Sequence, residues 1–92
     1  MKKYRVEHST RFKMDLKKAV KRGLNLKLLD EVVEMLEEGR TLPSKYRDHA
    51  LKGEWRTFRE CHIAPDWLLV YKIKQNVLVL VLQRMGTHSD LF

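Results

Sequence analysis

The sequence is short of cysteine, proline and long apolar runs. Its single cysteine excludes an internal disulfide framework, which suits a reducing compartment such as the cytoplasm. Its longest apolar run, Val77–Leu82, is far shorter than the ~20 residues that cross a bilayer. The basic start, Met1–Arg5, is not followed by the apolar region of a secretion signal. We therefore expect a cytoplasmic protein without a membrane partner.

A length of 92 residues predicts one domain, residues 1–92, with one hydrophobic core. Hydrophobic residues make up 43% of the chain, which is too many for a disordered tail. The net charge of +7 points to an anionic partner. The charge is uneven, because residues 1–28 carry a net +8, residues 29–39 a net −5 and residues 40–92 a net +4. We interpret the acidic block as the solvated face of a helix.

Two segments with apolar residues at helical spacing are bounded by capping residues. Ser9 or Thr10 begins the first helix, and Gly23 ends it. Asn25 begins the second helix, and Gly39 ends it. The short link between them predicts an antiparallel helical hairpin. The apolar positions are Phe12, Leu16, Ala19 and Val20 in the first helix and Leu29, Val32, Val33 and Leu36 in the second.

Strand patterns lie on both sides of the hairpin. Successive side chains of residues 4–8 suit opposite faces of a sheet, and this alternation predicts a short strand. After a basic loop over residues 40–53, the runs Trp55–His62, Trp67–Ile73 and Val77–Arg84 predict three strands joined by short turns, and thus an antiparallel meander. The last run begins with six apolar residues, so we expect it to be central and buried on both faces. The β-α-α-β-β-β order predicts an α+β fold with the helical hairpin packed on one face of an antiparallel sheet.

Polar side chains gather at the ends of the last strands. His62 closes one strand and Asp66 opens the next, so the two side chains should be neighbours. Arg84 ends the last strand, with His88 four residues later, and both reach the same edge if that strand returns there. Histidine gives and takes protons near neutral pH, and arginine fits phosphate. Such groups on a basic protein suit RNA cleavage through the 2′-hydroxyl, which needs no metal ion or other cofactor.

Each of these residues also has a simpler interpretation. A single histidine is commonly a surface residue, Asp66 suits a turn after proline, and Trp55 and Trp67 suit a core. Cys61 has the opposite strand parity to His62, which argues against a nucleophilic cysteine–histidine pair. The four side chains His49, His62, Asp66 and His88 include zinc ligands, but their spacing matches no common zinc site.

Three segments together resemble the YafQ-type toxins of the RelE/ParE superfamily, which belong to bacterial type II toxin–antitoxin systems. Residues 46–55 read YRDHALKGEW and are similar to that family's Y-[KR]-D-H-x-L-x-G-x-[WY] segment. Residues 59–71, RECHIAPDWLLVY, resemble its R-[DE]-x-H-x-x-P-D-[WL]-[LI]-L-[IV]-Y segment. Residues 84–92, RMGTHSDLF, resemble its C-terminal R-x-G-[TS]-H-x-x-L-F. The resemblance extends from the first strand to the last residue and implies the RelE-like fold.

The resemblance also implies an activity, a site and partners. Members of the family resemble ribonucleases that cut mRNA in the ribosomal decoding site, and the implied catalytic set is His49, His62, Asp66 and His88. Arg84, Trp67 and Phe92 are the implied substrate-binding residues, to which we add Lys52 of the basic loop. The implied partners are an antitoxin, the ribosome with its mRNA, and operator DNA through the antitoxin complex. We expect ribosome docking through the basic side chains of the first helix, namely Arg11, Lys13, Lys17, Lys18, Lys21 and Arg22.

Two other functions remain open from the sequence. ParE-like members share the fold and inhibit gyrase, so a non-catalytic protein that blocks gyrase or another partner is the main alternative. A plain nucleic-acid-binding or zinc-binding domain is the second. The first alternative predicts no RNA cleavage and no effect from changing the histidines, and elemental analysis would test a zinc-binding domain.

Overall fold

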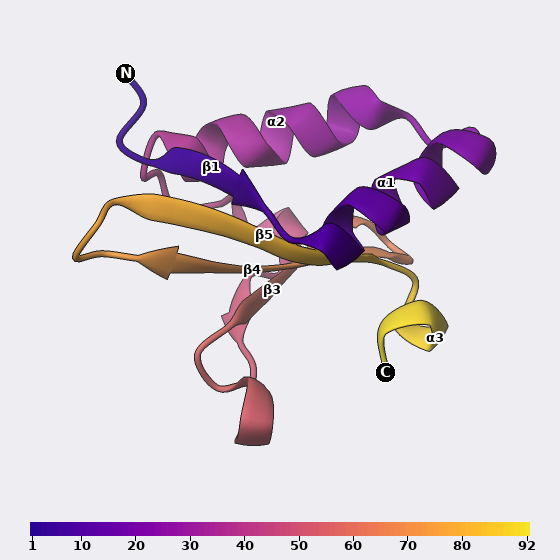
Figure 1. The fold of residues 1–92 in the computed structure, drawn as a ribbon. Coiled ribbons are helices and arrows are strands. Elements are labelled where there is room, and N and C mark those ends of the chain that lie inside the picture. Colours follow the sequence, from indigo (N-terminus) through magenta and orange to yellow (C-terminus); the bar gives the residue numbers. More distant parts are fainter.

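The computed structural model describes all residues from Met1 to Phe92 (Figure 1). Its elements run in the order β1-α1-α2-η1-β2-η2-β3-β4-β5-α3, where η denotes a 3-10 turn. Their bounds are β1 Arg5–His8, α1 Thr10–Lys21, α2 Leu26–Glu37, η1 Ser44–Tyr46, β2 His49–Ala50, η2 Gly53–Trp55, β3 Arg59–Ala64, β4 Trp67–Lys74, β5 Val79–Gly86 and α3 His88–Leu91. No helix is long and apolar enough to cross a membrane.

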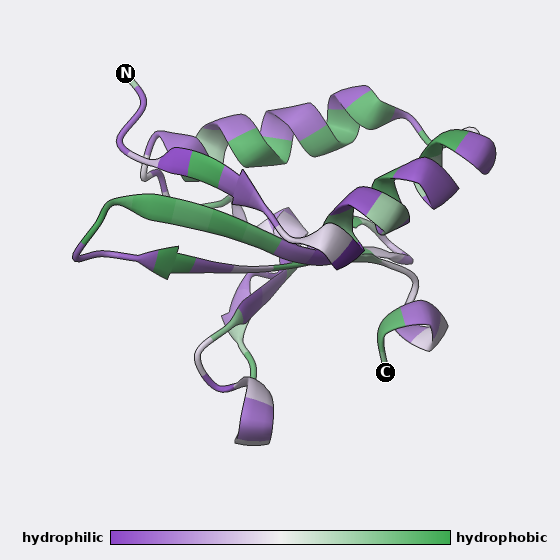
Figure 2. Cartoon of the chain, in the orientation of Figure 1, coloured by the Kyte–Doolittle hydropathy of each residue, from purple (hydrophilic) through white to green (hydrophobic).

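Both long helices begin at the predicted caps. The Ser9 hydroxyl accepts a hydrogen bond from the Phe12 amide at 2.9 Å, and the Asn25 side chain accepts one from the Lys27 amide at 3.1 Å. Gly23 follows α1 with a φ of 71°, a left-handed conformation that suits glycine. The helices cover one face of the sheet, and Figure 2 shows hydrophobic residues along the side of each that faces it. The predicted hairpin is therefore confirmed.

The five strands form one sheet in the order β1-β5-β4-β3-β2. The pairs β2–β3, β3–β4 and β4–β5 are antiparallel, which confirms the α+β class and the predicted meander. The expectation of a wholly antiparallel sheet needs one correction, because β1 pairs with β5 in parallel. The helical hairpin carries the chain across the sheet to its far edge. The meander then returns strand by strand and places β5 beside β1.

Two predicted strand boundaries were wrong. Residues 55–58 belong to η2 and the turn after it, so β3 begins at Arg59. Val77 and Leu78 form the β4–β5 turn and are 56% and 46% exposed, because Leu78 adopts a left-handed φ of 52° to reverse the chain. From Val79 onward β5 is an interior strand, and Val79, Leu80 and Leu82 are buried as expected.

The core lies between the helices and one face of the sheet. Cys61 and Ile63 of β3 belong to this core, together with Leu69 of β4 and helical residues such as Phe12. Because side chains alternate along a strand, His62 and its alternate neighbours point to the opposite face. The sheet therefore separates a core face from a second face that the long helices leave uncovered.

Candidate active site

The uncovered face of the sheet brings together side chains from three strands. His49 of β2 lies opposite Glu60 of β3, and His62 lies two residues further along β3 on the same face. His62 in turn pairs with Leu68 of β4, and Leu68 pairs with Gly86 at the end of β5. The end of β5 therefore returns to the edge where β3 ends, which meets the condition that the sequence left open.

His49 is held by contacts at both ring nitrogens. Its Nδ1 lies 2.7 Å from the Arg47 carbonyl oxygen, which fixes the proton on Nδ1 in a hydrogen bond to that acceptor. Its Nε2 lies 3.5 Å from Oε1 of Glu60. The His49 side chain is half exposed, so a ligand can reach its ring.

Glu60 is a further residue of this candidate site, and the sequence patterns did not single it out. Its side chain is only 5% exposed, and its Oε2 is buried without a hydrogen-bond partner. A buried carboxylate is costly, so one beside a histidine indicates a functional arrangement. The signal in the sequence was strand parity, which places Glu60 on the same face as His62.

Asp48 anchors the segment that carries His49. Its carboxylate accepts hydrogen bonds from Arg59 Nη2 at 3.1 Å and from the Tyr71 hydroxyl at 2.5 Å. Burial and this contact raise the pKa of Tyr71, which therefore stays a neutral donor. Adjacent residues of a strand point to opposite faces. Asp48 thus ties the chain to the core side of the sheet while His49 points toward Glu60.

Replacing Asp48 with alanine should destabilise the protein by about 1–3 kcal/mol, because the buried Tyr71 hydroxyl loses its acceptor. The position of His49 should become less fixed as well, because Asp48 no longer anchors the chain beside it. Urea denaturation measures the first effect. Tyr71→Phe in the Asp48→Ala background removes the unpaired hydroxyl and should recover part of the stability. No recovery would contradict the assigned cause.

The helix α3 places His88 beyond the end of β5. Thr87 caps α3, since its side chain accepts from the Asp90 amide and Asp90 accepts from the Thr87 amide. Arg22, the residue directly after α1, adds an ion pair to Asp90 at 2.8 Å, and these contacts lower the pKa of the Asp90 carboxyl. Gly86 allows this packing, because a Cβ there would meet Asp90 at 2.9 Å.

Aromatic contacts join α3 to the segment between β2 and β3. The centre of the Phe92 ring lies 5.5 Å from the centre of the His88 ring and 6.5 Å from that of the Trp55 ring. The centres of the Trp55 and Phe58 rings are 5.4 Å apart. Phe92 is 56% exposed and Trp55 is 37% exposed. Both rings can therefore contact a nucleobase. The sequence pattern placed Trp55 in a strand, so its contact with Phe92 was not foreseen.

Two predicted substrate residues have other surroundings. Trp67 is 4% exposed and belongs to the core, so its ring is not open to a substrate. Arg84 donates from Nε to Asp15 at 2.8 Å, and its side chain is 15% exposed. Strand-end position could not reveal that α1 supplies this carboxylate.

The other predicted residues lie at the surface. Asp66 is exposed in the β3–β4 turn directly after the strand that carries His62, and Lys52 is exposed before η2. The six basic residues of the first helical segment are all exposed. Arg22 is bound to Asp90, so it helps to hold α3. The other five, Arg11, Lys13, Lys17, Lys18 and Lys21, form no ion pair.

Residues 4–92 match the family described as bacterial toxins of type II toxin-antitoxin systems, YafQ. The chain belongs to this YafQ family. It is 36% identical over 88 residues to the mRNA interferase toxin YafQ of Escherichia coli K12, covering 95% of this chain and 94% of that protein. It is 34% identical to a putative toxin YafQ of Haemophilus influenzae, covering 94% of this chain and 89% of that one.

Solved structures of YafQ relatives share the whole fold. A metal-bound toxin from Helicobacter pylori is 50% identical, with a TM-score of 0.91, and covers 97% of this chain and 99% of that one. The toxin of the E. coli DinJ-YafQ toxin-antitoxin complex is 35% identical, with a TM-score of 0.89, and covers 98% of both chains. In the present YafQ-family chain, histidine, cysteine, aspartate and glutamate side chains form no group of three that could hold a metal ion.

The one cysteine of this YafQ-family chain lies outside the site. Cys61 is fully buried on the core face, and burial together with the nearby Asp48 and Glu60 carboxylates raises the pKa of its thiol. We expect the native protein to resist alkylation by iodoacetamide at pH 8, at which an exposed thiol reacts within minutes, and to react once it is unfolded in guanidinium. Mass spectrometry measures both. Rapid alkylation of the native protein would contradict the assignment.

Proposed function

We propose that this toxin is a ribosome-dependent endoribonuclease that cleaves translated mRNA without a metal ion. The proposal is supported by its YafQ family and by one observation above all. The sheet register pairs His49 with Glu60, two residues before His62, and brings the end of β5, which leads into α3, to the edge where β3 ends. This arrangement offers several proton-transfer and cationic groups to one phosphodiester.

The proposed reaction uses the 2′-hydroxyl of the RNA as its nucleophile. A base removes the 2′-hydroxyl proton, the oxygen attacks the adjacent phosphorus, and a phosphorane forms. The bond to the 5′-oxygen then breaks, and an acid protonates that oxygen. We assign the base and acid to His88 and Asp66, one to each role. The products are a 2′,3′-cyclic phosphate, which can hydrolyse to a 3′-phosphate, and a 5′-hydroxyl.

His49 and His62 are proposed to bind and neutralise the phosphorane, whose charge stabilisation is commonly the larger contribution to catalysis. Glu60 acts as a positioning residue in this proposal, because its buried carboxylate faces Nε2 of His49 and limits rotation of the ring. Phe92 and Trp55 would stack on bases, while Lys52 would bind backbone phosphate. Arg84 could reach phosphate only through the guanidinium nitrogen that its contacts with Asp15 leave free.

The exposed basic side chains of α1 are proposed to dock the toxin on the ribosome by contacting ribosomal RNA phosphates. Such contacts weaken steeply with added salt. The same basic surface fits an antitoxin with an acidic or amphipathic segment, and operator DNA would be bound only through that complex.

The deciding experiment is inducible expression followed by primer extension on a translated message. Cuts at codon-spaced positions that disappear in the His49, His62 or His88 variants support the proposal. Cleaved ends with a 5′-phosphate would overturn the mechanism, as would cleavage of isolated RNA that requires Mg²⁺. Toxicity without RNA cuts, and unaffected by the histidine variants, would instead favour a gyrase-type inhibitor.

A further inference from the structure

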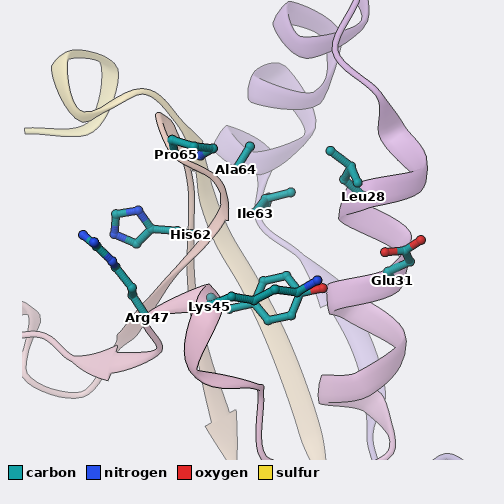
Figure 3. Close-up of a pocket in the computed structure, with 9 residues that line it drawn as sticks. Leu28, Glu31, Lys45, Arg47, His62, Ile63, Ala64 and Pro65 are labelled. Carbon is teal, nitrogen blue, oxygen red and sulfur yellow. The ribbon is translucent and has the colours of Figure 1, made fainter.

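A cleft of about 390 Å³ opens beside His62. It lies between α2, the η1 turn and the end of β3 (Figure 3). Figure 3 shows the His62 ring and the Arg47 side chain on the same side of β3, while Leu28 and Glu31 approach the cleft from α2. Its volume falls within the ~300–1,000 Å³ typical of small-ligand sites.

One wall of the cleft, formed by the η1 turn and the end of β3, is cationic, with Arg47 beside His62 and Lys45 extending toward α2 (Figure 3). Arg47 and Lys45 are exposed and form no ion pair, although the Lys45 ammonium lies 5.0 Å from the centre of the Tyr46 ring. Arg47 has a φ of 50°, a left-handed conformation that costs energy for a residue with a Cβ. Strain of this kind is concentrated at functional sites. The Arg47 carbonyl also contacts His49, so the same residue links the cleft to the site.

The opposite wall is formed by α2, where Leu28 is 37% exposed and Glu31 adds one carboxylate. Ile63, Ala64 and Pro65 at the end of β3 add apolar surface to the first wall. Glu31 has no ion-pair partner. Cationic groups beside apolar surface suit a ligand with a phosphate at one end and a flat ring at the other. A carboxylate near the ring can accept a hydrogen bond from an exocyclic amino group.

We propose that this cleft is a subsite for the RNA nucleotide next to the scissile phosphate. Arg47 binds that nucleotide's phosphate beside His62, and its base lies against Leu28 and Pro65. Glu31 accepts from an amino group of the base, which favours adenine, cytosine or guanine over uracil. This subsite rests on the proposed function, since it extends the same RNA path beyond His62.

The test is an NMR titration of the ¹⁵N-labelled protein with three probes. These are a 2′-O-methylated adenine dinucleotide, which cannot be cleaved, inorganic phosphate and adenosine. The dinucleotide should shift amides on both walls, at Leu28 and Glu31 as well as at Arg47 and Ile63. Phosphate should shift only the cationic wall. Dinucleotide shifts that are confined to the cationic wall, or to α1, would overturn the subsite.

Variants separate the two walls. Arg47→Asn removes the charge and suits the left-handed backbone, so the protein should stay folded while dinucleotide affinity falls about 5–10-fold. Leu28→Ala should lower the affinity for the dinucleotide about threefold and leave the affinity for phosphate unchanged. Lys74→Gln removes a positive charge at the other end of β4 and should change neither affinity by more than about 1.5-fold. Equal effects of Arg47→Asn and Lys74→Gln would overturn the proposal.

Cleavage of translated mRNA by the same variants distinguishes the two proposals. If the unmodified toxin cleaves mRNA but Arg47→Asn and Leu28→Ala match Lys74→Gln in both binding and cleavage pattern, the subsite alone is wrong. If the unmodified toxin gives no RNA cuts, the proposed function itself fails, whatever the cleft binds. Weaker cleavage by Arg47→Asn and Leu28→Ala supports both proposals if it is most reduced at sites where adenine, cytosine or guanine flanks the scissile phosphate.

Discussion

His88→Ala should lower the rate of mRNA cleavage by about 10²–10⁴-fold, the contribution of a positioned acid or base. The imidazole is the group nearest the chain end that can transfer a proton near neutral pH. It is held by a capped helix whose Asp90 also binds Arg22, so the loss should come from chemistry and not from misfolding. Quantitative primer extension after a short induction measures the rate.

Ser89→Ala is the matched control, because Ser89 is the exposed next residue of the same helix. It should cleave within about twofold of the unmodified protein, and both variants should unfold at the same urea concentration. A His88→Ala protein that is folded and cleaves at the native rate would remove His88 from the site. A pH profile adds a second readout, since loss of an acid or base should flatten one limb of the curve.

The ends of the helices were predictable because their causes are local. Ser9 and Asn25 cap amides only two or three residues away, and Gly23 supplies the left-handed conformation directly after α1. The order of the last three strands was predictable for a similar reason, since short turns force neighbours to pair. Confirmed features of this kind depend on contacts between residues that are close in the chain.

The parallel pairing of β1 with β5 has no local cause. It depends on the path of the helical hairpin, which carries the chain to the far edge of the sheet before β2 forms. The two-residue strand β2 was equally hidden, because His49 and Ala50 pair with β3 within a segment that has loop composition. Strand parity alone would nevertheless have placed Glu60 beside His62 and made it a candidate.

The surroundings of a side chain were harder to predict than its position along a strand or helix. The sequence gives no measure of how deeply Trp67 lies in the core, or of which group neutralises Arg84. Both follow from the packing of α1 and the turns against the sheet, over separations such as the 69 residues between Asp15 and Arg84. Family motifs therefore indicated a candidate region of the chain, while the contacts of individual side chains needed the structure.

Asp15→Ala should destabilise the protein by about 3–5 kcal/mol, the cost of leaving one member of a buried ion pair alone. The Asp15 carboxylate accepts from Arg84 Nε at 2.8 Å, from Arg84 Nη2 at 3.3 Å and from the Met85 amide at 2.9 Å. These bonds hold α1 against β5 beyond the end of β1. Met14→Ala, at the exposed neighbouring position, should change stability by less than about 0.5 kcal/mol. Similar urea midpoints for the two variants would contradict this role.

A double variant then decides what Arg84 does besides bind Asp15. Replacing the pair with Asp15→Leu and Arg84→Met should recover most of the stability, because apolar pairs of similar volume often substitute for buried ion pairs. If Arg84 also binds the scissile phosphate, the refolded double variant should still cleave mRNA at least 10-fold more slowly than the unmodified protein. Full recovery of both stability and cleavage would assign Arg84 to the junction of α1 and β5 alone. The phosphorane would then be neutralised by His49, His62 and the exposed cations beside them.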